Sequence, residues 1–161
     1  MERPKQPIAV ILRRDTVEGR WETHRWDLHA VVPDVGGQAR TTVEGERTLL
    51  RVFPGFELEL FRDEAEGYYL NASSPVASVF ASLRIDEATG EPYPFLVTMS
   101  YNEAARWMDA NERVERVEAR PELAAWLAQW VEANYRPEPK KRQRPRSFEG
   151  KEGQFRKEGT S

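Results

Sequence analysis

The side chains that could do chemistry are few, and the first group is a pair of histidines. His24 and His29 are the only imidazoles in the chain. On a strand, residues separated by an odd number of positions face opposite sides, so these two cannot ligate one metal ion unless a bulge lies between them. We therefore interpret both as surface or edge histidines, and the sequence predicts no metal site.

The second group is acidic and comprises Asp63, Glu64 and Glu66. Carboxylates this close in sequence could hold a hard cation, or could supply a general acid and a general base. A charged turn between two strands has the same composition, and we prefer that interpretation. The chain also lacks a nucleophile elbow and a P-loop, and Gly36-Gly37 lacks the third glycine of a dinucleotide-binding fingerprint. We therefore predict a protein that is not an enzyme and that uses no cofactor.

The third group is a basic run near the C-terminus. It reads KKRQRPR and comprises Lys140, Lys141, Arg142, Arg144 and Arg146. Such a run could follow phosphates, bind an anionic lipid surface or dock on an acidic protein, although a solubilising extension looks the same. Residues 1–135 hold 15 Lys and Arg against 23 Asp and Glu, a charge of −8, whereas residues 136–161 hold 9 against 4, a charge of +5. Because the acidic body repels a nucleic acid, only the tail could attach one, and salt would weaken that attachment.

The composition limits the class of protein further. The chain has 161 residues, which is enough for one domain of ordinary size. It has no cysteine, which excludes disulfides, thiolate metal sites and a cysteine nucleophile. No apolar run approaches the roughly 20 residues of a membrane-spanning helix, and Ile8–Leu12 is too short for a signal peptide. We expect a cytoplasmic protein with one globular α+β domain over residues 1–135 and a disordered, basic, Pro- and Gly-rich tail over residues 136–161.

The elements that must position these groups are mostly strands. In the stretch Phe53–Asn71, residues 56–60 alternate apolar side chains with glutamate, as a half-buried strand does. A second β-prone run, Thr48–Phe53, precedes them, so we expect a hairpin that turns at Pro54-Gly55. The other expected strands are Pro7–Arg14 in a central position, Trp21–Val32, a weak edge strand at Thr41–Val43, Glu66–Ala72, Val76–Ile85, Phe95–Met99 and Arg113–Ala119.

Two stretches predict helices near the C-terminus. Ser100 and Glu103 form an S/T-x-x-E capping box ahead of a short helix over Asn102–Ala110. Apolar residues then recur at helical spacing from Leu123 to Tyr135 and predict the strongest helix of the chain. The expected fold is therefore α+β, with about seven or eight mostly antiparallel strands in a curved sheet or partly open β-barrel and two C-terminal helices packed on it.

Several segments taken together resemble one protein family. They are Ile8–Arg14, the W-x-x-H-R-W block of Trp21–Trp26, the run Gly55–Asn71 with its E-x-Y-x-x-N segment, Leu83-Arg84, the capping-box helix, Val114–Val117 and the Trp-rich last helix. Over about Pro7–Arg146 the chain resembles domain-of-unknown-function family 3305, a family of small proteobacterial proteins. Genes of this family often lie beside those for molybdenum-dependent formate dehydrogenases and their maturation factors, and no catalytic residue is established for it.

The resemblance implies a non-enzymatic accessory protein, either a maturation factor or a small subunit, for a molybdenum-dependent formate dehydrogenase. Its partner would be a formate dehydrogenase subunit or a chaperone. The residues expected to shape the binding face are Trp21, His24, Trp26, Tyr68 and Asn71, with Lys140, Lys141, Arg142, Arg144 and Arg146 docking on an acidic partner. The alternative hypothesis is a nucleic-acid or anionic-surface binding module that acts through the tail, and a third is an enzyme that uses the acidic group around a metal.

Overall fold

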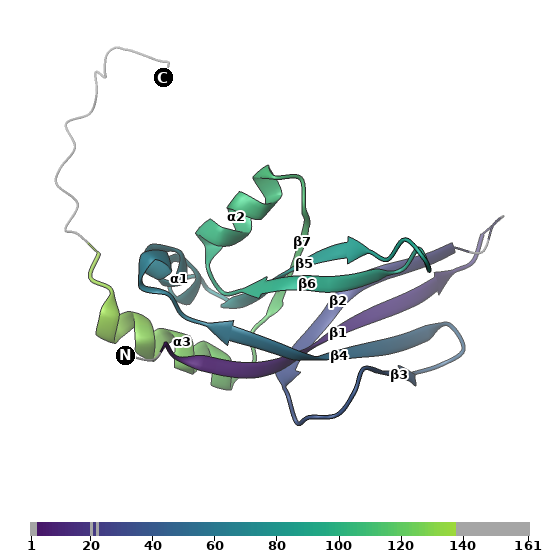
Figure 1. Ribbon diagram of the computed structural model, residues 1–161, viewed down its shortest axis with the longest axis horizontal. Helices are drawn as coiled ribbons and strands as arrows, with labels where there is room; N and C mark the ends of the chain where they lie inside the picture. The colour runs from purple at the N-terminus through teal and green to yellow at the C-terminus, as the bar shows by residue number, and fades with distance from the viewer. Residues whose placement is uncertain (1–2, 20, 22, 138–161) are drawn as a thin grey trace, which may run out of the picture.

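Two antiparallel β-sheets pack face to face, and three α-helices gather at one end of them (Figure 1). The structure is a computed structural model that describes residues 3–19, 21 and 23–137. In chain order the elements are β1 (Lys5–Val17), β2 (Thr23–Pro33), β3 (Arg40–Val43), β4 (Thr48–Glu59), the 3-10 turn η1 (Arg62–Glu64), α1 (Ala65–Ala72), β5 (Ser78–Ile85), β6 (Pro92–Thr98), α2 (Tyr101–Asp109), β7 (Arg113–Glu118) and α3 (Pro121–Asn134). The predicted α+β class is confirmed, with two facing sheets in place of one curved sheet.

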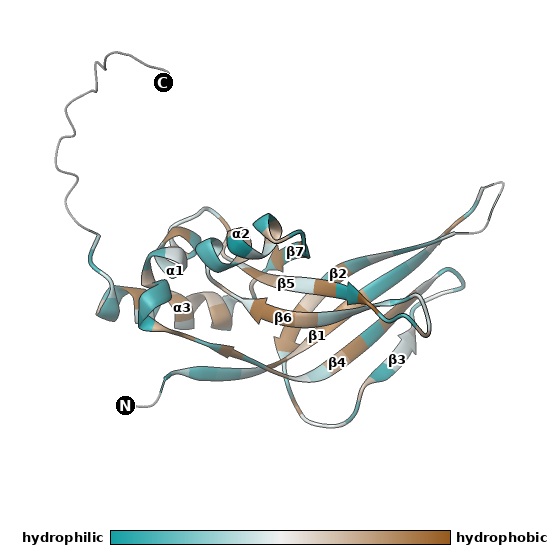
Figure 2. Cartoon of the chain, turned by 45° about the horizontal axis from the view of Figure 1, so that its top comes forward, coloured by the Kyte–Doolittle hydropathy of each residue, from teal (hydrophilic) through white to brown (hydrophobic). Residues whose placement is uncertain are grey.

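The four-stranded sheet has the order β2-β1-β4-β3. Its central strand β1 buries Ile8, Val10 and Leu12 almost completely, because aliphatic and β-branched side chains fill the space between two facing sheets well. β3 lies at the edge, as expected for the weakest strand. β2 and the last part of β1 form a hairpin that extends away from the helices (Figure 2).

Pro54-Gly55 is a bulge within one long strand and not the turn of a hairpin, so that prediction is wrong. β4 pairs with β1 on both sides of the bulge, and Pro54 and Gly55 together lie opposite Ala9. Gly55 has φ +91°, a conformation that glycine adopts readily. Its N–H donates to Asp34 Oδ2 at 2.9 Å. The Gly36 and Gly55 amides together hold the pKa of Asp34 below its usual value, so the carboxylate that holds the bulge is charged at neutral pH.

The three-stranded sheet has the order β6-β5-β7, and most residues of its central strand are buried on both faces. Val79, Ala81 and Leu83 of β5 point toward the other sheet and join one core with residues of β1, β2 and β4. Because β2 lies beside β7 and β4 lies beside β6, the edges of the two sheets are close to each other. The two sheets form a sandwich whose edges nearly meet.

Side chains bridge the edges of β2 and β7 in place of a backbone ladder. Glu115 accepts a hydrogen bond from the Leu28 backbone N–H at 2.7 Å. Arg113 donates to the Trp26 backbone carbonyl. These bonds use backbone groups that an edge strand would otherwise offer to another chain. The sandwich is therefore held together along this side without closing into a barrel.

Residues 65–72 form helix α1, so the predicted strand Glu66–Ala72 is wrong. Gly67, Tyr68 and Asn71 are its buried residues, and this spacing belongs to one face of a helix. The Tyr-Tyr-Leu run has strand propensity, but packing against α2 and α3 outweighs that weak preference. The Ser-Ser-Pro segment that follows ends the helix where it was expected to end a strand.

The two predicted C-terminal helices are confirmed. The Ser100 hydroxyl caps α2 by accepting a hydrogen bond from the Glu103 N–H at 3.1 Å. α2 is largely hydrophilic in Figure 2 and buries only Ala104. α3 buries Leu123, Leu127 and Val131 on one face, as its spacing predicted. Within the described ranges, no helix is both long enough and apolar enough to cross a membrane.

Gly67→Ala should destabilise the protein. A Cβ at this position would lie 2.0 Å from Ser100 Oγ and 3.1 Å from the Asn102 backbone nitrogen, at the capped start of α2. Because α2 cannot shift without losing its cap, we expect a loss of about 1–3 kcal/mol in unfolding free energy, measured by urea denaturation.

Gly45→Ala is the matched control, since a Cβ there meets no atom within 4 Å. It should change the unfolding free energy by less than about 0.5 kcal/mol. Equal stability of the two variants would contradict the close packing of α1 on α2.

Candidate functional site

The five predicted partner-binding residues of the body do not form one face. Trp21 and His24 lie at the tip of the β1–β2 hairpin, at the end of the sandwich away from the helices (Figure 1). Trp26 lies further along β2 and belongs to the core between the sheets. Tyr68 and Asn71 lie on α1, at the other end of the molecule. The basic residues Lys140, Lys141, Arg142, Arg144 and Arg146 fall outside the described residues.

Tyr68 is part of the core and cannot touch a partner directly, because its exposed fraction is 0%. Its hydroxyl accepts a hydrogen bond from the Phe61 N–H at 3.1 Å and donates to the Glu59 carbonyl at 3.2 Å. Its ring meets the Trp130 ring edge-on, with 5.4 Å between the centroids. Tyr68 therefore joins the end of β4 to α3. It can affect a binding surface only by positioning the residues that cover it.

Asn71 is also fully buried, and its amide joins two strands of the second sheet. Its Nδ2 donates to the carbonyls of Ser78, at 2.7 Å, and of Met99, at 2.8 Å. Its Oδ1 accepts from the Ser78 N–H at 2.9 Å. The side chain thus connects the beginning of β5 to the residue that follows β6. Tyr68 and Asn71 of the E-x-Y-x-x-N segment are therefore buried residues that hold the fold together.

The acidic group does not converge on a common point. Glu64 accepts a hydrogen bond from the Ser100 hydroxyl at 2.7 Å and forms an ion pair with Arg106. Glu66 accepts from the Asn102 amide at 3.1 Å. The two carboxylates therefore join the beginning of α1 to α2. The predicted charged turn between two strands is instead a 3-10 turn that leads into a helix.

Both histidines are exposed, in agreement with their interpretation as surface residues. His24 Nδ1 lies 3.1 Å from the Thr16 hydroxyl of the neighbouring strand. Across residues 3–19, 21 and 23–137, no group of three or more potential ligands from His, Cys, Asp and Glu is placed to hold a metal ion.

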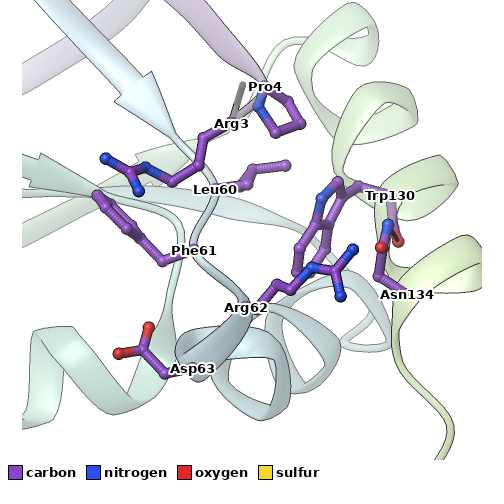
Figure 3. A pocket seen from close by; sticks show the side chains of 8 residues that line it. All are labelled: Arg3, Pro4, Leu60, Phe61, Arg62, Asp63, Trp130 and Asn134. Atoms are coloured by element: carbon purple, nitrogen blue, oxygen red, sulfur yellow. Dashed lines mark hydrogen bonds between the residues drawn. The ribbon is translucent and has the colours of Figure 1, made fainter. Parts of the chain in front are cut away.

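A pocket of about 600 Å³ lies where the segment before β1 and the end of β4 approach α3 (Figure 3). Sequence reasoning missed it. Its lining residues are Arg3, Pro4, Leu60, Phe61, Arg62, Asp63, Trp130 and Asn134. The lining residues come from three segments that are distant in the sequence. The sequence shows that Trp130 and Asn134 are four residues apart, but this spacing only places both on one side of a helix.

The walls of this pocket are aromatic and its rim is charged. The Arg3 guanidinium lies over the Phe61 ring, 4.8 Å from its centroid, and forms an ion pair with Glu59 outside the pocket. Arg62 and Asp63 bring opposite charges to the opening, so the rim has no strong field of either sign. The lining offers flat apolar surface and hydrogen-bond donors, but it has no adjacent nucleophile and base. Its geometry suits binding of a flat group better than catalysis.

The fold is that of a small α+β protein with two facing sheets. Helices pack at one end of the sheets, and side chains connect the edges of β2 and β7. A family model described as "Protein of unknown function (DUF3305)" matches residues 7–144. This match covers most of the chain, and the protein belongs to that family. Neither a curated protein nor a solved structure matches the chain.

Asn71→Ala should destabilise the protein strongly. The substitution removes three hydrogen bonds and leaves two buried carbonyls and one N–H without their partner. Each such group costs about 1–3 kcal/mol, so a loss of several kcal/mol in unfolding free energy is expected by urea denaturation. Asn102→Ala, which removes one exposed hydrogen bond, should cost less than about 1 kcal/mol. Similar losses of stability for both variants would contradict the role of the Asn71 side chain in connecting β5 to the end of β6.

Tyr68 should ionise only in strong alkali, because burial raises its pKa from 10.0 to about 12. Since the folded protein holds this proton more tightly than the unfolded chain, the stabilisation is complete below pH 10. It is lost as the pH rises from about 10 to about 12. Urea denaturation measured across this pH range should show a fall in the free energy of unfolding. The fall should be smaller for Tyr68→Phe, which has no hydroxyl to ionise. An equal pH dependence in both proteins would contradict the assignment.

Proposed function

We propose that the protein is a non-enzymatic accessory protein that acts by binding another protein. The proposed partner is a molybdenum-dependent formate dehydrogenase, which this chain would serve as a maturation factor or a small subunit. The gene context of family 3305 supports this choice of partner. The surface of the chain supports binding as the mode of action.

The observation that carries the proposal is the exposure of Trp21. Its side chain is 76% exposed at the tip of the β1–β2 hairpin, and Val17 beside it is 44% exposed. Tryptophan is enriched among the residues that dominate binding energy at interfaces, since it buries a large area for few rotatable bonds. Burial of about 150–250 Å² at roughly 25 cal/mol per Å² could contribute several kcal/mol, as an upper bound.

Hydrogen bonds to the segment around the start of β4 hold the end of β1, which leads into the hairpin that carries Trp21. The Thr16 N–H donates to the Arg47 carbonyl at 2.8 Å, and the Thr48 hydroxyl donates to Asp15 at 2.9 Å. The Thr48 hydroxyl and the Arg13 guanidinium hold the pKa of Asp15 below its usual value, which keeps this anchor charged at neutral pH.

Trp21→Ala should reduce capture of the partner at least tenfold. Tagged full-length protein and the variant would be used to capture proteins from cells that make the formate dehydrogenase, with its subunits quantified by mass spectrometry at moderate and high salt. Met108→Ala is the matched control, because Met108 is a large apolar side chain that is 52% exposed on α2. It should leave capture unchanged, since apolar docking is local and tolerates salt.

A chain truncated after residue 135 separates this proposal from the alternative one. If the body binds the partner, the truncated chain should capture the same subunits. If only nucleic acid is recovered, and only with the tail present and at low salt, the tail-dependent function replaces the accessory role.

A further inference from the structure

Arg14 is an arginine on the inner face of a β-sandwich. It is two residues from the fully buried Leu12 on β1 and therefore points to the same side of the sheet. Its register partners are Trp26 on β2 and Leu49 on β4, which both belong to the core. Arg14 lies near the end of β1, away from the helices and a few residues before the hairpin tip. Its side chain leaves the backbone among apolar neighbours, where a cation needs an acceptor.

The Arg14 Nε is buried, and no described residue accepts a hydrogen bond from it. Buried polar groups in folded proteins are almost always paired, so this N–H is an exception, although Arg14 as a whole is only partly buried. The adjacent Arg13 shows the ordinary arrangement, because its Nε donates to Asp15 at 3.0 Å on the exposed side of the strand. Arg14 therefore needs an explanation that its neighbour does not.

Two more guanidinium groups surround Trp26, and each has its own carboxylate. Arg51 lies over the Trp26 ring, 5.0 Å from the centroid, and pairs with Glu91 at 2.6 Å. Arg113 donates to the Trp26 carbonyl and pairs with Glu115. With Arg14, this cluster has three cations and two anions, and so an excess of one positive charge.

We infer that the Arg14 guanidinium, beside the buried Trp26, receives one carboxylate, supplied by an acidic side chain of the protein partner. This inference rests on the proposed function, because the cluster lies at the same end of the sandwich as Trp21. A single excess charge matches a monoanion better than a phosphate dianion. A planar carboxylate also suits a guanidinium, which can bind it with two parallel hydrogen bonds. The docking surface would then combine the apolar anchor of the hairpin with one buried ion pair behind it.

Acetate is the probe for the site, and the Arg Nε–H resonances of the full chain are the readout. One resonance that is absent from Arg14→Gln should shift on titration with acetate and saturate at constant ionic strength. Arg120→Gln is the matched control and should retain that shift, because Arg120 is an exposed arginine at the start of α3. A resonance that does not move, or that moves equally with chloride, overturns the site, and an equal response to phosphate overturns its preference for a carboxylate.

Capture of the partner tests the source of the carboxylate. Arg14→Gln should reduce capture about tenfold without lowering the melting temperature, because it removes a buried N–H that has no acceptor in the free protein. Arg120→Gln, at an exposed arginine before α3 that pairs with Glu122, should change neither. A saturating acetate shift with unchanged capture by Arg14→Gln overturns the protein partner as the source. If Arg14→Gln does not fold, Arg14→Lys keeps the charge but lacks the Nε–H, and the same losses of resonance and capture are expected.

The two proposals fail in different ways. If Trp21→Ala captures the partner normally while acetate still binds at Arg14, the hairpin proposal fails and the anion site stands. If Trp21→Ala loses capture and no acetate response is seen, the accessory role stands and the Arg14 site is wrong.

Discussion

The helical end of this protein depends on the amide of Asn71. A fully buried side chain with three hydrogen bonds connects the start of β5 to the end of β6, and α1 is thereby fixed against the second sheet. Once α1 is fixed, Gly67 permits the close approach of α2, and Tyr68 packs beneath Trp130 of α3. Such a network stabilises the fold only when every member is satisfied, because an unpaired buried amide is costly. The three helices therefore form one packed unit.

The two ends of the sandwich differ in chemistry for a physical reason. At the helical end, Leu123, Leu127 and Val131 of α3 pack against the core. At the other end no helix covers the sheets, and arginines and glutamates replace apolar side chains around Trp26. Charges at this end need partners of their own, and the buried Nε of Arg14 has no hydrogen-bond acceptor among the described residues. This asymmetry is the reason that we propose docking at the hairpin end.

The family-like segments consequently have different roles. The E-x-Y-x-x-N segment is accounted for by packing, since Tyr68 and Asn71 are fully buried. The W-x-x-H-R-W block begins with the exposed Trp21 and ends with the buried Trp26, so it spans the route from the hairpin tip to the arginine cluster. Packing therefore accounts for one of the two segments, whereas the other joins an exposed tryptophan to a buried one.

Local signals in the sequence determined the strands of the sandwich, the capped start of α2 and the apolar face of α3. Each of these follows from side-chain periodicity or from a cap that lies within a few residues of the backbone it serves. Tertiary structure decided the rest. The hydrogen-bond partner of Gly55 is 21 residues away, and one acceptor of the Asn71 amide is 28 residues away, so neither the bulge nor helix α1 could be predicted locally. The pocket beside Trp130 and the position of Arg14 between two sheets likewise depend on segments that meet only after folding.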